Sequence, residues 1–150
     1  MIKIVIMFFC TLFALSTIAS ETHCAEVVKI NNSGITNIYS TREHIKVEIV
    51  TQSVKGETYN YIVKKLNIFV NGVDIGVSKS AYGDLYEPLE GKIVVLKKKK
   101  LTYLEIYGGD GSESYFVRIY FGSKGVNRRV LYSPIIPGKL EETRYWTREL

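Results

Sequence analysis

Residues 66–77, with the sequence LNIFVNGVDIGV, decide the fold of this 150-residue chain. Apolar residues alternate with others on both sides of Asn71-Gly72, which is the pattern of two half-buried strands. Asn-Gly is the preferred centre of a two-residue type I′ turn because both positions need a positive φ. With Val70 opposite Val73, one face of this hairpin carries six apolar side chains, from Leu66, Ile68, Val70, Val73, Ile75 and Val77. The stretch therefore predicts an antiparallel sheet.

Strand patterns continue on both sides of this hairpin. Upstream, 27–30 is a short predicted strand, and apolar residues alternate with Lys and Glu over 45–49. Residues 31–39 between them are rich in turn formers, and 82–91 carries the Gly, Asp and Pro that are typical of a long surface connection. Four further strands are predicted downstream: Ile93–Leu96, Leu101–Tyr107, Tyr115–Phe121 and Arg128–Ser133.

The links between these four strands are short, so neighbours in sequence should pair antiparallel. In the second and third of them, the alternation assigns an inner face to Leu104, Ile106, Val117, Ile119 and Phe121. The chain is thus expected to be all-β, a single domain of about seven antiparallel strands forming a sandwich or an open barrel.

The N-terminus predicts export. Lys3 precedes an uncharged apolar run over 4–15, and small residues follow up to Ser20. The run is shorter than the about 20 residues of a membrane-spanning helix, so it predicts a cleaved signal peptide over 1–19. Cleavage after residue 20 is the alternative, and 20–150 is the predicted exported domain, periplasmic or extracellular.

Removal of the signal leaves Cys24 as the single cysteine of the mature chain, which excludes an intramolecular disulfide. We expect a free thiol on an N-terminal arm, with a disulfide-linked dimer as the less favoured alternative.

The chain carries a net charge of +5 and should contact anionic surfaces. Lys97, Lys98, Lys99 and Lys100 lie at a predicted hairpin tip, where they could bind anionic lipid, glycan or wall polymer. A solvated turn that discourages edge pairing is the simpler interpretation. Nucleic acid is not an expected partner.

The outer face of the two central predicted strands is unusually aromatic. It carries Tyr103, Glu105, Tyr107, Phe116, Arg118 and Tyr120. Tyr and Arg are frequent at binding hot spots, so this face is the candidate partner-binding site. Tyr is also a preferred strand residue, and a packing ladder is the alternative.

Two further features leave alternatives open. Trp146, the single Trp, lies among basic residues and predicts either an interface anchor or a plug at one end of the core. The Gly-rich loop 108–113 is expected to be a hairpin connection, because neither the following helix of a phosphate loop nor a full set of calcium ligands accompanies it.

No catalytic signature is visible, and neither a metal nor a cofactor is expected. The sequence therefore favours an exported, non-catalytic binding protein of a bacterial envelope, of the inhibitor or immunity type, that recognises a macromolecule through the Tyr and Arg face. The alternative is a binder of anionic polymer or membrane surface through the lysine turn, and a more remote one is a hydrolase without a recognisable motif.

Overall fold

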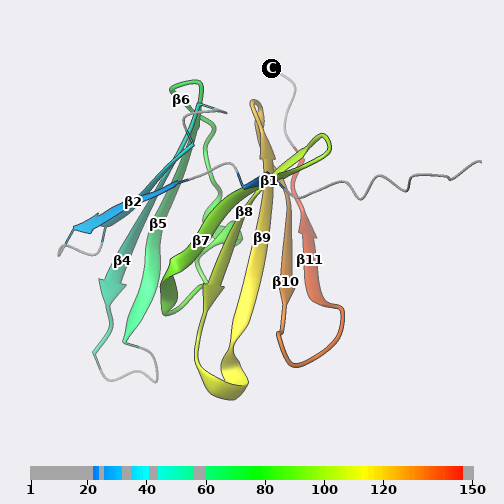
Figure 1. Ribbon diagram of the computed structural model, residues 1–150. Coiled ribbons are helices and arrows are strands. Elements are labelled where there is room, and N and C mark those ends of the chain that lie inside the picture. The colour runs from blue at the N-terminus through cyan, green and yellow to red at the C-terminus, as the bar shows by residue number, and fades with distance from the viewer. Residues whose placement is uncertain (1–21, 24–25, 32–34, 41–43, 56–59, 147–150) are drawn as a thin grey trace, which may run out of the picture.

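The computed structural model describes residues 22–23, 26–31, 35–40, 44–55 and 60–146. In this part of the chain the protein is all-β, with two antiparallel sheets that face each other and almost no helix (Figure 1). The first sheet has the strand order β2-β3-β4-β5-β6 and the second β1-β7-β8-β9-β10-β11. Each sheet is an up-and-down meander, apart from the short β1 that joins the edge of the second.

The first sheet contains β2 (Glu26–Asn31), β3 (Ile35–Ser40), β4 (Ile45–Ser53), β5 (Tyr61–Val70) and β6 (Val73–Asp74). The second contains β1 (Thr22–His23), β7 (Pro88–Lys98), β8 (Leu101–Gly108), β9 (Tyr115–Gly122), β10 (Gly125–Tyr132) and β11 (Lys139–Arg144). Short 3₁₀ turns cover Lys79–Ala81 and Gly111–Glu113.

The Asn-Gly turn between β5 and β6 is confirmed. Asn71 and Gly72 have φ values of +53° and +80°, and Val70 pairs with Val73. The expected second strand is shorter than predicted, because β6 ends at Asp74, and Val73 is 63 % exposed. Ile75 and Val77 nevertheless pack against the core as expected, and the Ile75 N–H donates to the Ile68 carbonyl. The Asp74 carboxylate accepts a hydrogen bond from the backbone N–H of Gly76, whose φ of +65° turns the chain away from β5.

Two segments that were predicted to be a turn and a surface connection contribute to the sheet and to the core. Residues 35–40 form β3, which lies between β2 and β4, because pairing on both edges overrides the local turn propensity. In the 82–91 connection, Tyr82 and Leu85 are buried in the core. The Leu85 carbonyl accepts a hydrogen bond from the Val63 N–H, and this bond holds the connection beside β5.

The four strands of the predicted C-terminal meander are confirmed as β7 to β10. β7 and β10 start earlier than predicted, at Pro88 and Gly125, and β10 ends at Tyr132, one residue before its predicted end. The sequence prediction missed β11, whose charged sequence KLEETR has no apolar alternation. The five side chains assigned to the inner face of β8 and β9 are all buried.

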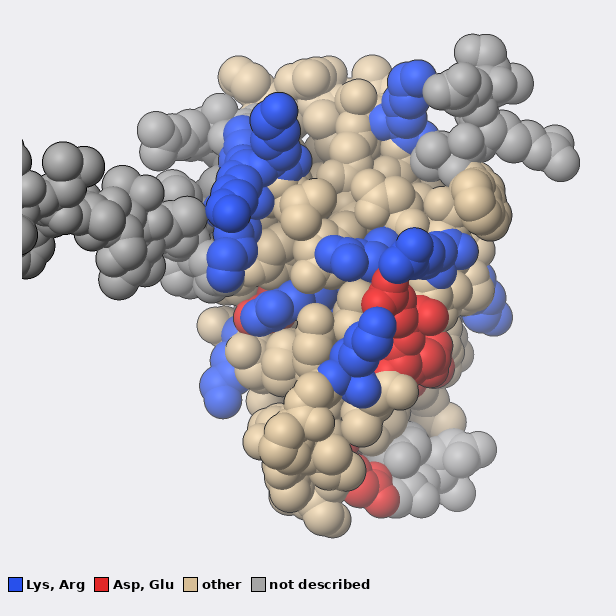
Figure 2. All heavy atoms as spheres, turned by 90° about the vertical axis from the view of Figure 1, so that its right-hand side faces the viewer, with Lys and Arg blue, Asp and Glu red and all other residues tan. Residues whose placement is uncertain are grey.

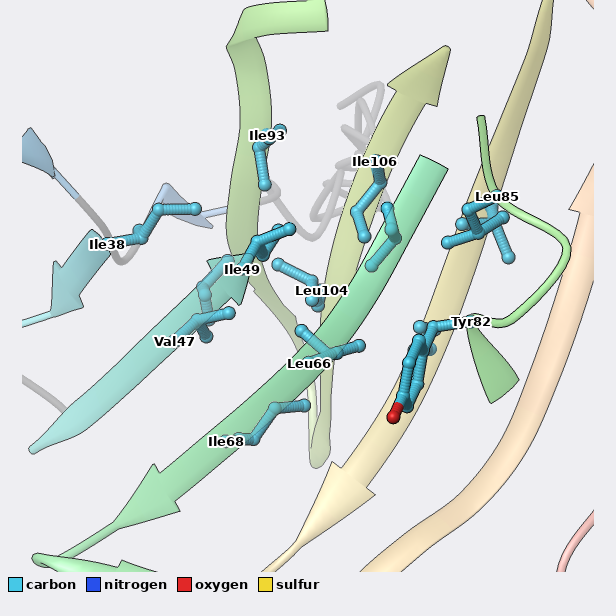
Figure 3. Close-up of a cluster of buried hydrophobic side chains, with 14 of the residues drawn as sticks. Ile38, Val47, Ile49, Leu66, Ile68, Tyr82, Leu85, Ile93, Leu104 and Ile106 are labelled. Carbon is cyan, nitrogen blue, oxygen red and sulfur yellow. The ribbon is translucent and has the colours of Figure 1, made fainter. Parts of the chain in front are cut away.

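The core lies between the two sheets (Figure 3). The first sheet contributes Ile38, Val47, Ile49, Leu66 and Ile68, and the second contributes Ile93, Leu104 and Ile106. Tyr82 and Leu85 come from the connection between the sheets and close the side of this cluster. Both meanders therefore bury their apolar faces against one another.

The predicted signal peptide, residues 1–19, and Cys24 lie outside the described residues. Among the residues that are described, no helix is long and apolar enough to cross a membrane.

Candidate partner-binding face

The outer face of the second sheet carries the six side chains predicted as a binding site. The β8–β9 register pairs Tyr103 with Tyr120, Glu105 with Arg118, and Tyr107 with Phe116. Pairing with β10 extends each of these pairs into a row that runs across the strands. We call them the upper row (Tyr103, Tyr120, Arg128), the charged row (Glu105, Arg118, Val130) and the aromatic row (Tyr107, Phe116, Tyr132).

The aromatic row is a stack of three half-buried rings. The ring centroids of Tyr107 and Phe116 are 5.2 Å apart, and those of Phe116 and Tyr132 are 4.6 Å apart with an interplanar angle of 6°. The rings thus stand upright on the sheet with their faces against one another. Both faces of the central Phe116 ring are therefore covered by its neighbours.

The charged row is held together by an ion pair inside an aromatic frame. Arg118 Nε donates to Glu105 Oε2 over 2.5 Å. The Arg118 guanidinium carbon lies 5.3 Å from the ring centroid of Tyr103 and 5.2 Å from that of Tyr132. Burial opposes the charge of Arg118, but the hydrogen bond and the charge of Glu105 outweigh it and raise the pKa of the guanidinium. Arg118 is therefore a fixed cation.

The upper row is largely closed to solvent. Tyr103 and Tyr120 are buried, with ring centroids 5.1 Å apart, in a small cluster with Leu96 and Val130. The Arg128 guanidinium carbon lies 3.9 Å from the ring centroid of Tyr120 and covers it.

Of the six predicted site residues, the structure leaves Tyr107, Phe116 and Arg118 partly accessible, whereas Tyr103, Glu105 and Tyr120 form the buried base of the face. The sequence reasoning missed Tyr132 and Arg128 as members of this face. The alternation within the predicted strand 128–133 would have found them once that strand was paired with its neighbour.

The lysine run adjoins this face at the β7–β8 turn. The expected hairpin tip is shorter than four residues, because Lys97 and Lys98 belong to β7 and only Lys99 and Lys100 form the turn. Lys98, Lys99 and Lys100 are exposed. Figure 2 shows the Lys and Arg side chains of this side of the molecule in separate clusters, with acidic side chains beside the central one. The broader basic face is therefore not continuous in this view.

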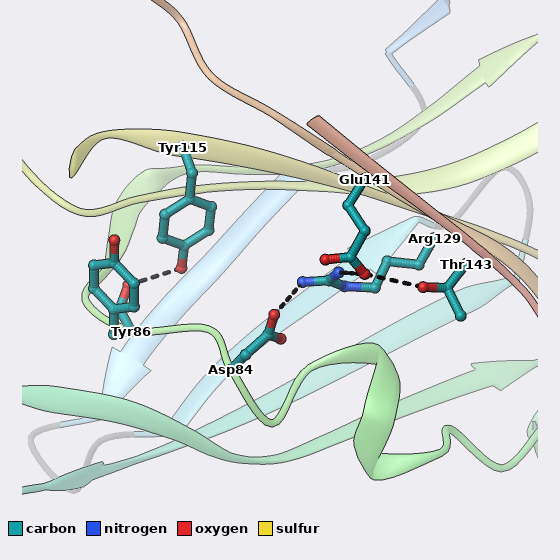
Figure 4. A network of polar contacts seen from close by, with 6 residues as sticks. All are labelled: Asp84, Tyr86, Tyr115, Arg129, Glu141 and Thr143. Carbon is teal, nitrogen blue, oxygen red and sulfur yellow. Dashed lines mark hydrogen bonds and ion pairs between the residues drawn. The ribbon is translucent and has the colours of Figure 1, made fainter. Parts of the chain in front are cut away.

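A second polar feature lies on the inner side of β10. Arg129 is 1 % exposed and donates to Asp84 Oδ2 over 2.6 Å and to Glu141 Oε1 over 3.0 Å (Figure 4). Thr143 Oγ1 also donates to Glu141 Oε1. This network ties β11 and the connection between the sheets to β10. No sequence pattern marked Arg129 as buried, because its contacts depend on the three-dimensional arrangement.

Trp146 is 95 % exposed, so it is not a core plug, whereas Tyr145 before it packs against the core. The loop 108–113 is a hairpin connection, as predicted, with a short 3₁₀ turn. Within the described residues, no group of three or more His, Cys, Asp or Glu side chains could hold a metal ion.

Comparison with protein-family models, with curated proteins and with solved structures found no match.

Proposed function

We propose that this chain is an exported, non-catalytic binding protein that holds a protein partner on the outer face of its second sheet. The observation that carries the proposal is the aromatic row beside Arg118, three stacked and partly accessible rings on the outer face of the sheet. Aromatic side chains and Arg are the residues that contribute most to binding energy at protein interfaces.

The ring orientation favours a protein over a flat ligand. Sugars and bases stack on open ring faces, but in this row the Phe116 ring is stacked between Tyr107 and Tyr132. Ring edges and polar tips suit a partner that offers apolar side chains and hydrogen-bond acceptors. The buried base formed by Tyr103, Glu105 and Tyr120 keeps the row in place before binding, which lowers the entropic cost of association.

If the chain is exported, as proposed, its partner lies in the cell envelope or in the medium. The apolar run 4–15 with Lys3 before it and small residues after it is the support for a signal peptide. A single-domain protein with a fixed face of this kind suits an inhibitor or an immunity-type protein, which acts by covering another macromolecule.

The test is affinity capture with residues 20–150 carrying Cys24→Ser, from the envelope and medium of the encoding organism. We compare this protein with a Phe116→Ser/Tyr132→Ser variant and with Phe69→Ser, a half-buried aromatic on the outer face of the first sheet. The expected result is one protein retained in about 1 M NaCl and bound about tenfold or more weakly by the double variant only. Equal retention by all three proteins would exclude the aromatic row as the site.

A second candidate is binding of an anionic lipid, glycan or wall polymer by the lysine turn, favoured by the exposure of Lys98, Lys99 and Lys100. Electrostatic binding of this kind should weaken steeply as the salt concentration rises. A Lys99→Ser/Lys100→Ser variant would then lose binding in dilute buffer, whereas the Phe116→Ser/Tyr132→Ser variant would keep it.

A further inference from the structure

A groove of about 280 Å³ opens at the lower end of the molecule, away from the lysine turn. It lies between the connection that precedes β7, the β8–β9 loop and the β10–β11 loop. Its lining is mostly apolar and includes Leu85, Tyr86, Tyr115, Leu131, Ile136 and Leu140. This groove is separate from the outer face described above, since Leu85, Tyr115 and Leu131 belong to or pack against the core between the sheets.

One wall of the groove is rigid. The Tyr115 hydroxyl donates to the Tyr86 carbonyl over 2.7 Å, and the Tyr86 hydroxyl donates to the Glu113 carbonyl over 3.1 Å (Figure 4 shows the first of these bonds). The two rings pack with centroids 5.2 Å apart. A Cβ atom at Gly108 would lie 2.3 Å from the Tyr115 hydroxyl oxygen, so glycine there lets the ring reach its place. The wall is thus formed before any ligand arrives.

The opposite wall exposes large apolar side chains. Ile136 is 56 % exposed and Leu140 49 % exposed, and Ile135 beside them is also exposed. Ser133 Oγ accepts a hydrogen bond from the Ile135 N–H, which shapes this end of the loop. Figure 2 shows the lower end of the molecule as mostly uncharged. Apolar side chains gathered at the mouth of a groove are typical of a site that another molecule covers.

The rim carries negative charge although the whole chain is basic. Asp84 and Glu113 both line the groove. Arg129 holds Asp84 at the groove by a 2.6 Å ion pair, and the Asp84 side chain remains 57 % exposed. Glu113 is exposed at the opposite loop. Because Arg129 already offsets the charge of Asp84, Glu113 is the main carboxylate that a cation at the mouth would meet.

We propose that this groove binds a segment of a partner protein in which a Leu-like apolar side chain is followed by Lys or Arg. The volume lies just below the range of about 300 to 1,000 Å³ typical of small-molecule pockets, so it suits one anchoring side chain. The apolar side chain packs between the Tyr86–Tyr115 wall and Ile136, while the neighbouring cation pairs with Glu113.

The probe is the blocked dipeptide acetyl-Leu-Lys-amide, titrated into isotope-labelled protein of residues 20–150 carrying Cys24→Ser and followed by backbone amide NMR. We expect saturable shifts confined to 84–86, 112–115 and 131–140, with a Kd in the millimolar range or below. Acetyl-Leu-Glu-amide and acetyl-Ala-Lys-amide are the matched ligands, and each should bind roughly three- to tenfold more weakly.

Three variants locate the site. Glu113→Gln should weaken acetyl-Leu-Lys-amide roughly two- to fivefold and leave acetyl-Leu-Glu-amide no weaker. Leu140→Ser should weaken both leucine peptides, whereas Leu101→Ser, at a side chain of the same exposure on the opposite end of the sheet, should weaken neither. Equal affinity for the Lys and Glu peptides, shifts outside the groove, or no saturable binding at about 10 mM peptide would overturn the proposal.

Discussion

At the scale of single residues, Arg129 is a buried cation whose charge is met by two half-exposed carboxylates. Its Nε atom is buried without a hydrogen-bond partner among the described residues. Truncation of Asp84 leaves a buried cation with one carboxylate less, whereas replacement of Arg129 by Met leaves two carboxylates that water can reach.

We therefore expect an asymmetry between the two sides of this network. Asp84→Ala should lower the free energy of unfolding by about 1 to 3 kcal/mol. Arg129→Met should lower it by less than about 1 kcal/mol, since its apolar side chain fills a similar volume. Urea denaturation measures both, with the exposed Asp110→Ala as the control expected within about 0.5 kcal/mol of the unaltered protein. A larger loss for Arg129→Met than for Asp84→Ala would contradict this account.

The lowered pKa of Glu142 predicts how the stability of the fold depends on pH. Hydrogen bonds from Lys139 and Arg144 lower the pKa of its carboxyl from the ordinary 4.5 to about 2. Because the folded pKa is the lower one, the stabilisation is complete above the unfolded pKa and is lost as pH falls from near 4.5 towards 2. An NMR titration of the Glu142 side-chain carboxyl carbon should report this low pKa in dilute buffer. Added salt and Lys139→Met should each raise the pKa, and insensitivity to both would exclude the ion pairs as its cause.

At the scale of elements, the β5–β6 turn depends on a glycine for its backbone and not for space. Gly72 has a φ of +80° and no atom near its missing Cβ, while Gly122, at the end of β9, has the same open space without a positive φ. Gly72→Ala should therefore cost about 1 to 2 kcal/mol of stability. Gly122→Ala should be neutral or stabilising by up to about 1 kcal/mol, since alanine lowers the entropy of the unfolded chain. Thermal denaturation of the two variants side by side measures the difference, and equal melting temperatures would argue against a strained turn.

The elements that could be predicted from sequence are those whose apolar pattern and turn chemistry agree, such as β4, the β5 side of the Asn-Gly turn, and β8 with β9. β3 was missed because its polar residues resemble a turn, and only pairing with strands on both edges makes it a strand. β11 was missed for a related reason. Its sequence KLEETR has no apolar alternation, and only pairing with β10 makes it a strand.

At the scale of the whole molecule, the sequence places the six residues of the outer face on one side of the sheet, because β8 and β9 both alternate regularly. How far each side chain is buried could not be predicted. Tyr103 and Tyr107 have the same chemistry and lie on the same strand, yet Tyr103 is closed in by Leu96, Tyr120 and Val130 from neighbouring strands. The groove at the lower end could not be predicted from the sequence either, because its walls come from three segments that are distant in sequence.

The two sheets share one core, so they should unfold together. Leu66 on β5 and Leu104 on β8 belong to the same buried cluster between the sheets. Leu66→Ala should therefore lower stability by about 2 to 5 kcal/mol, and the loss should extend to the second sheet. Five tyrosines lie on strands of the second sheet (Tyr103, Tyr107, Tyr115, Tyr120 and Tyr132) and two on strands of the first (Tyr39 and Tyr61). Tyrosine fluorescence therefore reports on the second sheet more than on the first, whereas far-UV circular dichroism reports on all strands. In Leu66→Ala the two signals should shift to the same lower urea midpoint. A fluorescence midpoint that stays at the value of the unaltered protein would mean that the second sheet is stable without the first. The outer face, which needs β10 in place, would then depend on the second sheet alone, whereas the groove would still need Leu85, which is held beside β5 by the Val63 N–H.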